Sequence, residues 1–204
     1  MEILATLAIG YSFGSLSPAA LISKLKNKNL REHGTGNLGA SNTLLVFGKA
    51  LGVFVMVFDI LKAFLAAKLS EFLFPKLALS GLIAGFAAIV GHNFPFYLHF
   101  KGGKGLAAFG GTVLYYNPLF FLALLVFGLI LMFIFNFSVV MPMSAAILFP
   151  VLVYLQSGSL AEAAMAVASS LLIIIMHWSN IEKAKKRTDV PIREFVTKKL
   201  FRKK

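Results

Sequence analysis

Apolar runs of membrane-spanning length, separated by short polar segments, constrain this chain more than any other feature. An α-helix needs about 20 residues to cross the hydrocarbon core of a bilayer, and fewer where it is buried among other helices. The sequence therefore predicts an all-α, polytopic integral membrane protein with about seven transmembrane helices in a single domain, residues 1–204. The expected spans are Ile3–Ile22, Thr43–Phe74, Leu77–Val90, Leu106–Tyr116, Leu119–Phe135, Val139–Leu155 and Leu160–Met176.

The composition agrees with this class, because 58% of the residues are hydrophobic and only 14% are charged. A soluble domain of this length needs far more polar surface. The chain has no cysteine, which excludes a disulfide framework and thiolate chemistry. The net charge of +12 is compatible with nucleic acid, but the cations cluster in loops and in the tail beside apolar runs. Membrane lipid and phosphorylated substrates are therefore the expected partners, and nucleic acid is not.

Two polar, glycine-rich segments interrupt the apolar runs, and we call them the first and second glycine-rich loops. The first is Gly34–Asn42, with the sequence GTGNLGASN, and the second is Phe100–Gly105, with the sequence FKGGKG. Glycine has no Cβ, so backbone N–H groups in such loops can approach a ligand closely. The first loop also leads into an expected helix, whose N-terminal N–H groups favour an anion. Both loops are predicted to bind anions.

Each loop also has a purely structural explanation. The first could be a tight turn that lets helices pack, with the amides of Asn37 and Asn42 bonded to the loop instead of to a phosphate. In the second, the ammonium of Lys104 could reach a phosphate held by the neighbouring glycines. Lys101 and Lys104 could equally serve as interfacial anchors.

The distribution of lysine and arginine predicts the orientation in the membrane. Five of these residues lie around the first glycine-rich loop, two lie in the second loop and ten lie in the basic tail, residues 182–204. The opposite face carries only Lys68 and Lys76. The positive-inside rule then places both loops and the C-terminus in the cytoplasm and the N-terminus outside. The acidic start, with lysines after the first apolar run, is typical of a signal anchor and not of a cleaved signal peptide.

Three ionisable residues, two within an expected span and one just after another, are candidates for intramembrane support. Asp59 and Lys62 have i,i+3 spacing and share a helix face. Charges at that depth are unfavourable and often mark a functional site, although a pair that neutralises itself and rigidifies the bundle is an equal alternative. His92 follows Gly91 near the end of the third span, where it is expected to end the helix or brace a loop.

A second polar cluster is expected at the end of the last span. His177 and Asn180 are one turn apart and share a helix face. An imidazole there could donate to a phosphate or move a proton near neutral pH, and the alternative is a histidine that reaches the interface beside Trp178. The four histidines are scattered and no HExxH motif or paired carboxylates occur, so no metal site is predicted.

Four motifs in this order resemble the bacterial acyl-phosphate:glycerol-3-phosphate acyltransferases, which are small polytopic inner-membrane enzymes. The motifs are the GTGNLGASN of the first loop, then DILK from Asp59, then GHNFPFYLHFKGGKG from Gly91, and then HWSNI from His177. The start at Gly14, GSLSP, is also similar to the family's GSIP. The resemblance covers nearly the whole chain, and the FKGGKG block after GHNFP is its most specific part.

The resemblance implies that a fatty acyl group moves from acyl phosphate to the 1-position of glycerol-3-phosphate, giving lysophosphatidic acid and phosphate in phospholipid synthesis. It implies no cofactor, and an active site that faces the cytoplasm. Lys104 would stabilise developing charge, and Ser138, His177 and Asn180 would position glycerol-3-phosphate. The phosphate-binding residues would be Thr35, Gly36, Asn37, Gly39, Asn42, Gly102, Gly103 and Gly105.

The chain departs from the family pattern where the family has arginines. Leu45 stands where the family usually has an arginine, Phe135–Ser138 replaces an arginine-rich RYVS segment, and Trp178 replaces the arginine of HRxNI. Losing guanidinium groups removes bidentate phosphate recognition. The alternatives to the acyltransferase are therefore a relative with an altered acceptor, a non-catalytic relative and a transporter of an anionic solute. No internal repeat of the kind common in transporters is evident.

Overall fold

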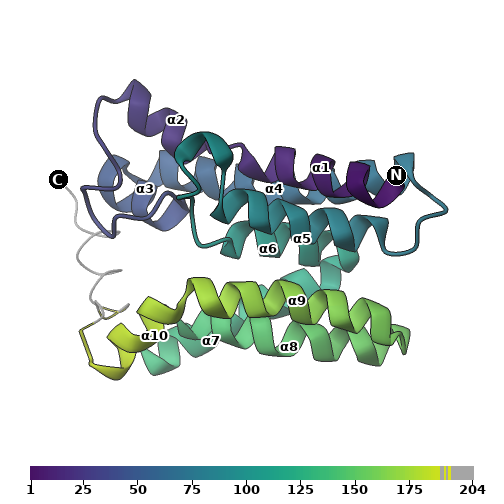
Figure 1. The fold of residues 1–204 in the computed structure, drawn as a ribbon. Helices are drawn as coiled ribbons and strands as arrows, with labels where there is room; N and C mark the ends of the chain where they lie inside the picture. The colour runs from purple at the N-terminus through teal and green to yellow at the C-terminus, as the bar shows by residue number, and fades with distance from the viewer. Residues whose placement is uncertain (189–190, 192, 194–204) are drawn as a thin grey trace. The chain divides into compact units, whose positions relative to one another are not determined.

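The computed structural model describes residues 1–188, 191 and 193, and every regular element in this part of the chain is helical. The described residues form two compact units, Met1–Pro118 and the residues from Leu119 onward, which are treated separately below (Figure 1). The predicted all-α class is confirmed. The prediction of a single domain, 1–204, stays a prediction, and most of the basic tail lies outside the described residues.

The first unit is a bundle of short and long helices. Its central element is α4 (Lys49–Leu73), which packs against α5 (Ser80–Asn93), α6 (Leu106–Tyr116) and α1 (Glu2–Ser15). The shorter α2 (Pro18–Leu25) and α3 (Ala40–Phe47) also contact α4. A 3₁₀ helix, η1 (Phe96–Leu98), precedes the second glycine-rich loop. The first glycine-rich loop leads directly into α3.

Small residues allow α1 and α5 to approach closely. A Cβ atom on Gly10 would overlap the carbonyl oxygen of Ala84, and one on Gly14 would overlap that of Ala88. Conversely, a Cβ atom on Gly91 of α5 would overlap the carbonyl oxygen of Tyr11 in α1. Backbones in such contact gain the dispersion and hydrogen-bond terms that drive helix association in lipid.

Two of the expected apolar runs each form two consecutive helices, although residues Glu2–Leu25 together still have the length and composition of one membrane span. The first apolar run forms α1 and α2, separated at Leu16–Ser17, because Ser17 caps α2 by accepting a hydrogen bond from Ala20 N–H at 3.2 Å and Pro18 starts it. The second run forms α3 and α4, separated at Gly48, whose φ of 96° favours glycine. The third begins three residues later than expected, since Leu77–Leu79 lie in a turn.

The second unit contains four helices. These are α7 (Pro118–Phe135), α8 (Val140–Ser157), α9 (Leu160–Met176) and α10 (Trp178–Lys185). Helices α8 and α9 pack against each other, and Gly128 of α7 faces Met141 of α8, whose Cγ would lie 2.9 Å from a Cβ atom at that glycine. The chain bends by 52° between α9 and α10. Pro118 belongs to the first unit by its contacts although α7 begins with it.

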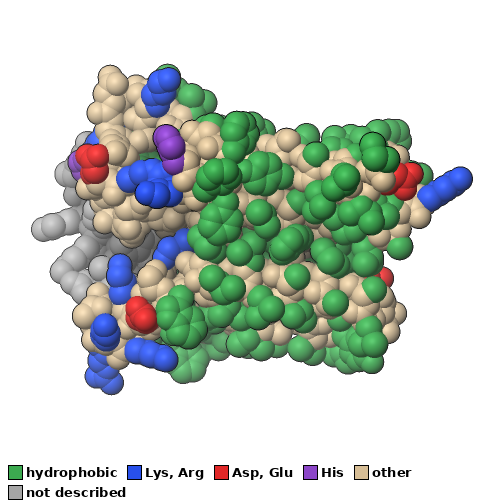
Figure 2. Space-filling model, in the orientation of Figure 1, with side chains coloured by type: hydrophobic (Ala, Val, Ile, Leu, Met, Phe, Trp, Pro, Cys, Tyr) green, Lys and Arg blue, Asp and Glu red, His purple; other side chains and the backbone are tan. Residues whose placement is uncertain are grey.

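The helices support a membrane protein by length and composition. Five helical segments of the described chain are long and apolar enough to cross a membrane, and six if the bent pair α9–α10 is one span. The remaining apolar helix, α6, has the short length expected from the sequence. On the face of the first unit drawn in Figure 2, hydrophobic side chains cover the helices and charged side chains lie at the ends. Such a surface suits lipid contact.

Candidate active site

The first glycine-rich loop is held by one buried side chain. Asn42, which is fully buried near the start of α3, accepts a hydrogen bond from Thr35 N–H at Oδ1 (2.7 Å). Its Nδ2 donates to the carbonyl oxygens of Leu30 (2.8 Å) and His33 (3.1 Å). Of the two roles considered for the Asn42 amide, the structure therefore shows the bond to the loop itself.

The rest of this loop divides into a packed part and an exposed edge. Gly34 has a φ of 64°, and a Cβ atom there would overlap Asn42 Oδ1. Gly39 is buried and precedes the first residue of α3. Thr35 is exposed, while Gly36 and Asn37 are half-buried. Gly34 and Ser41 are exposed as well, so the loop presents several of its residues to solvent.

The second glycine-rich loop is held by the end of α5. Gly102 N–H donates to the Asn93 carbonyl at 2.8 Å, and Gly103 N–H donates to the His92 carbonyl at 3.1 Å. A Cβ atom on Gly102 would overlap the His92 carbonyl oxygen. The glycines at 102 and 103 are therefore packing residues whose N–H groups are used within the protein. Lys104 is half-buried, and Gly105, with a φ of 83°, leads into α6.

The two loops lie next to each other in the first unit. The guanidinium of Arg31, just before the first loop, donates to the carbonyl oxygen of Lys101 in the second. A Cβ atom on Gly103 would overlap His92 Nε2 and would lie 2.7 Å from the carbonyl oxygen of Leu38. The two glycine-rich loops therefore meet in the first unit. His92 lies where the two loops meet, and its carbonyl oxygen accepts the Gly103 N–H.

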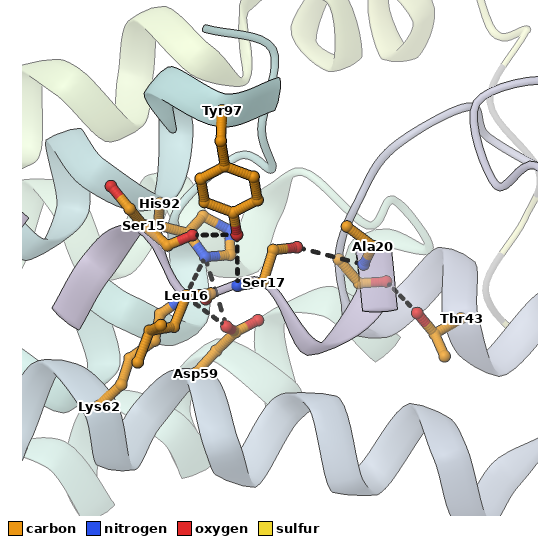
Figure 3. A network of polar contacts seen from close by, with 10 residues as sticks. Ser15, Leu16, Ser17, Ala20, Thr43, Asp59, Lys62, His92 and Tyr97 are labelled. Carbon is orange, nitrogen blue, oxygen red and sulfur yellow. Dashed lines mark hydrogen bonds and ion pairs between the residues drawn. The ribbon is translucent and has the colours of Figure 1, made fainter. Parts of the chain in front are cut away.

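A buried network of charges lies beside these loops (Figure 3). Lys62 Nζ is 2.7 Å from Asp59 Oδ1, 2.6 Å from the Leu16 carbonyl oxygen and 3.0 Å from His92 Nδ1. Asp59 and Lys62 are 2% and 3% exposed, and His92 is 8% exposed. The pair on α4 is therefore linked both to the break between α1 and α2 and to α5.

Tyr97 of η1 holds the same break from the other side. Its hydroxyl donates to the Ser15 carbonyl oxygen at 2.7 Å and accepts from Ser17 N–H at 3.1 Å (Figure 3). Tyr11 Oη similarly donates to the Phe94 carbonyl oxygen at 2.8 Å. Backbone groups freed by a helix break need such partners at membrane depth. The segment between α5 and the second loop thus packs on the broken first span.

In the second unit, His177 is positioned by the end of α9. It is 5% exposed, and its Nδ1 lies 2.9 Å from the Ile173 carbonyl oxygen. A carbonyl only accepts, so Nδ1 carries the proton and Nε2 is the acceptor nitrogen of the neutral ring. Asn180 N–H donates to the His177 carbonyl at 2.9 Å across the bend into α10. Trp178 is 55% exposed.

Ser138 lies in the short connection between α7 and α8 and is half-buried. The neighbouring Asn136 has a φ of 62° and accepts a hydrogen bond from Arg193 N–H at Oδ1 (2.9 Å). The Arg193 guanidinium donates to the Phe133 carbonyl oxygen from Nε (3.2 Å) and Nη2 (3.1 Å). This arginine therefore caps the C-terminal carbonyls of α7, where a cation is favourable.

Three contributors to the first unit's site were missed by sequence reasoning: Arg31, Tyr97 and the backbone at Leu16. Arg31 was counted only among the cations after the first span, and Tyr97 only as part of a motif. Their partners are backbone carbonyls, which no residue pattern reveals. The Ser17-Pro18 pair was the available signal for the break. No group of three or more possible metal-ligating side chains occurs among the described residues.

Comparisons with known proteins place the chain in a family. A family model described as glycerol-3-phosphate acyltransferase matches residues 4–187. The chain is 37% identical over 190 residues to the glycerol-3-phosphate acyltransferase of Macrococcus caseolyticus, covering 90% of this chain and 93% of that one. It is 34% identical over 188 residues to that of Geobacillus kaustophilus, covering 92% and 94%.

The fold agrees with the solved structures of an integral membrane glycerol 3-phosphate acyltransferase, PlsY. The glycerol 3-phosphate form matches with a TM-score of 0.90 and 28% identity over 99% of this chain and 100% of that chain. The lysophosphatidic acid form matches with a TM-score of 0.85 and 27% identity over 94% and 95%. With the apolar helices described above, these similarities identify the chain as an integral membrane protein, and it belongs to the glycerol-3-phosphate acyltransferase family.

Proposed function

We propose that this protein transfers a fatty acyl group from acyl phosphate to the 1-position of glycerol-3-phosphate, giving lysophosphatidic acid and inorganic phosphate for phospholipid synthesis. The observation that carries the proposal is the match of 99% of the chain to an acyltransferase structure in its glycerol 3-phosphate form. The donor, acyl phosphate, is supported by the resemblance of the FKGGKG and GTGNLGASN loops to the acyl-phosphate-dependent family.

The reaction needs no covalent enzyme intermediate, because an acyl phosphate is already an activated mixed anhydride. The glycerol hydroxyl attacks the acyl carbonyl carbon, a new ester C–O bond forms, and the bond between the acyl carbon and the phosphate oxygen breaks. The hydroxyl proton passes to the leaving phosphate or to a base. Catalysis then depends on proximity and on stabilisation of negative charge.

In the first unit, Lys104 is the proposed cation for phosphate. Its position beside the braced glycines supports this role, because the loop is fixed by main-chain bonds to α5 before any substrate binds. Thr35, Gly36 and Asn37 are the proposed phosphate contacts of the first loop. Gly39, Gly102, Gly103 and Gly105, with the Asn42 side chain, shape the two loops.

In the second unit, Ser138, His177 and Asn180 are proposed to hold glycerol-3-phosphate. The hydrogen bond from His177 Nδ1 to the Ile173 carbonyl oxygen leaves Nε2 as the proton acceptor of the neutral ring. That tautomer suits a group that takes the hydroxyl proton. No cofactor or metal is required by this chemistry.

We propose seven crossings of the bacterial inner membrane, with the N-terminus outside and both glycine-rich loops and the C-terminus in the cytoplasm. The five apolar helices, the bent pair α9–α10 and the short α6 supply the seven segments. The excess of lysine and arginine at the loops and tail supports the orientation. Both substrates would then reach the site from the cytoplasm and the inner leaflet.

The deciding experiment measures phosphate release from palmitoyl phosphate by purified protein in detergent, with and without glycerol-3-phosphate. We expect release that depends on glycerol-3-phosphate, formation of 1-palmitoyl lysophosphatidic acid, and no use of palmitoyl-CoA as a donor. Use of the CoA thioester in place of palmitoyl phosphate would contradict the proposed donor.

Because this chain lacks the arginines of the family pattern, the identity of the acceptor is tested separately from that of the donor. If folded protein releases phosphate with another phosphorylated alcohol but not with glycerol-3-phosphate, the proposed acceptor is wrong and the proposed donor, acyl phosphate, is retained. Folded protein that binds glycerol-3-phosphate with no turnover would contradict the proposed reaction. Uptake of phosphorylated solute into proteoliposomes without acyl transfer would contradict it in favour of transport.

A further inference from the structure

The buried ion pair of α4 makes more contacts than the neutralisation of its two charges requires. Asp59 and Lys62 neutralise each other at 2.7 Å, and together they could be replaced by apolar side chains with little loss of stability. The ammonium nevertheless has three N–H donors and three partners, the Asp59 carboxylate, the Leu16 carbonyl and His92 Nδ1. The pair therefore fixes two further elements beyond its own helix.

The contact with His92 determines how the imidazole is presented. An ammonium donates and cannot accept, so Nδ1 accepts from Lys62 and the proton of the neutral ring lies on Nε2. Asp59 Oδ1 lies 3.4 Å from the same Nδ1 and completes the cluster around the ammonium. One edge of the ring is thus held by α4 (Figure 3).

The other edge of the ring faces the glycine-rich loops. His92 Nε2 lies where a Cβ atom of residue 103 would be, next to the Leu38 carbonyl oxygen. The backbone of His92 also accepts the Gly103 N–H at 3.1 Å. Gly103 directly precedes Lys104. A displacement of His92 would therefore move the segment that carries the proposed phosphate-binding lysine.

We propose that Asp59, Lys62 and His92 form a positioning triad that holds the second glycine-rich loop, and with it Lys104, in place for substrate binding. The triad does not touch the reacting atoms. Its effect on catalysis rests on the proposed function, whereas its effect on the loop does not. Outer-shell partners that orient metal ligands change activity by about 10-fold to 100-fold, and we expect an effect of similar size for a triad that orients a binding loop.

The first test replaces both charges with apolar side chains, Asp59→Leu with Lys62→Met, and compares hydrogen–deuterium exchange in detergent with the wild type. We expect exchange in the peptide spanning residues 96–109 to rise about tenfold while the middle of α4 stays as protected as before. This readout requires no substrate. A rise throughout α4 and α5 would indicate a merely structural pair and would overturn the proposal, as would unchanged exchange in the loop.

Helix α4 provides a matched control. Lys68 and Glu71 have the same i,i+3 spacing and a separation of 2.9 Å, but each side chain is 50% exposed. The double change Lys68→Met with Glu71→Gln should leave exchange in the second loop and acyl transfer within twofold of wild type. An equal effect of both double changes would also contradict the proposal.

A second variant covers the case in which the first fails to fold, because that change also removes the donor to Leu16. His92→Leu keeps the Asp59–Lys62 pair and its bond to the Leu16 carbonyl, and removes only the contacts of the imidazole with Lys62 and with residue 103. We expect the same rise in loop exchange. His92→Asn, which keeps an acceptor for Lys62, should restore part of the loss.

Activity is measured on the same samples. The kcat/KM for palmitoyl phosphate should fall about 10-fold to 100-fold in His92→Leu and less in His92→Asn. Normal exchange and normal kcat/KM in folded His92→Leu would overturn the triad. A wild type that folds but transfers no acyl group would refute the proposed function instead, and the exchange data would still decide the inference.

Discussion

The two glycine-rich loops of the first unit are similar in composition but are held in different ways. The first is braced by a side chain, since the buried Asn42 amide bonds to Thr35, Leu30 and His33. The second is braced by main chain, since the N–H groups of residues 102 and 103 donate to the last carbonyls of α5. Gly36 in the first loop therefore mainly permits a turn, whereas Gly102 and Gly103 in the second permit close contact with α5.

This difference separates two ways of damaging a phosphate site. A side-chain brace is lost when its polar groups are removed, whereas a main-chain contact is lost when a methyl group is added. Neither of these two sets of hydrogen bonds includes a charged group, so the Lys104 ammonium is a third feature that can be changed separately. Changes to the cation, the contact and the brace should therefore have distinguishable effects on activity and on stability.

The largest effect is expected from removing the cation. Lys104→Met should lower kcat/KM for palmitoyl phosphate more than about a hundredfold, because the ammonium stabilises charge on phosphate, and should leave the protein folded. The assay is phosphate release, with thermal unfolding in detergent as the second measurement. Lys101→Met, at an exposed position in the same loop, is the matched control and should retain most activity. Full activity in Lys104→Met would refute its role.

Adding a methyl group to the second loop should have the next largest effect. In Gly103→Ala the new Cβ atom would overlap His92 Nε2 and would lie 2.7 Å from the Leu38 carbonyl, so the loops must separate. Overpacking of this kind costs about 1–3 kcal/mol. We expect a lower unfolding temperature together with at least a tenfold fall in kcat/KM. The control is Gly128→Ala in the second unit, where the nearest atom is the movable Cγ of Met141 at 2.9 Å.

Sequence reasoning located most helices because hydrophobicity marks them directly. The expected spans Leu106–Tyr116 and Leu160–Met176 agree with α6 and α9. The spans expected for α7 and α8 differ from the observed helices by no more than two residues at either end. The breaks at Leu16–Ser17 and at Gly48 were missed, because an apolar run continues across both and hydropathy does not register a helix end within such a run. Pro18 and Gly48 were the local signals that the hydrophobic pattern outweighed.

The same limit applies to the site. The residue types of the two loops were predicted, but the bonds that shape them were not, because most of their acceptors are backbone carbonyls of distant residues. Asn42 was considered as a phosphate ligand or as a brace, and only the positions of Leu30 and His33 decide between them. His92 reaches Lys62 across 30 residues of sequence, a contact that spacing cannot reveal.

Removing the side-chain brace should have a moderate effect. Asn42→Ala leaves the Thr35 N–H and the Leu30 and His33 carbonyls without their partner, and each unsatisfied buried group costs about 1–3 kcal/mol. Water can reach part of this loop, so we expect a total near the lower end of that range. The KM for the phosphate substrates should rise about fivefold, as measured by initial rates. Ser41→Ala, exposed one position earlier, is the control and should behave as wild type.

The smallest effect is expected where glycine only permits a turn. Gly36 has a φ of 73°. The atom nearest to a Cβ added at this residue would be the Arg31 carbonyl oxygen, at 3.1 Å. Gly36→Ala should therefore lower stability by about 1 kcal/mol through backbone strain. Gly158, with a φ of 64° and no atom within 4 Å of an added Cβ, provides the same strain in the second unit, at a residue that belongs to neither glycine-rich loop. If the first loop binds phosphate, Gly36→Ala should raise KM about twofold and Gly158→Ala should not. Equal kinetics in the two variants would show that the first loop has only a structural role. Phosphate binding would then belong to the second loop alone.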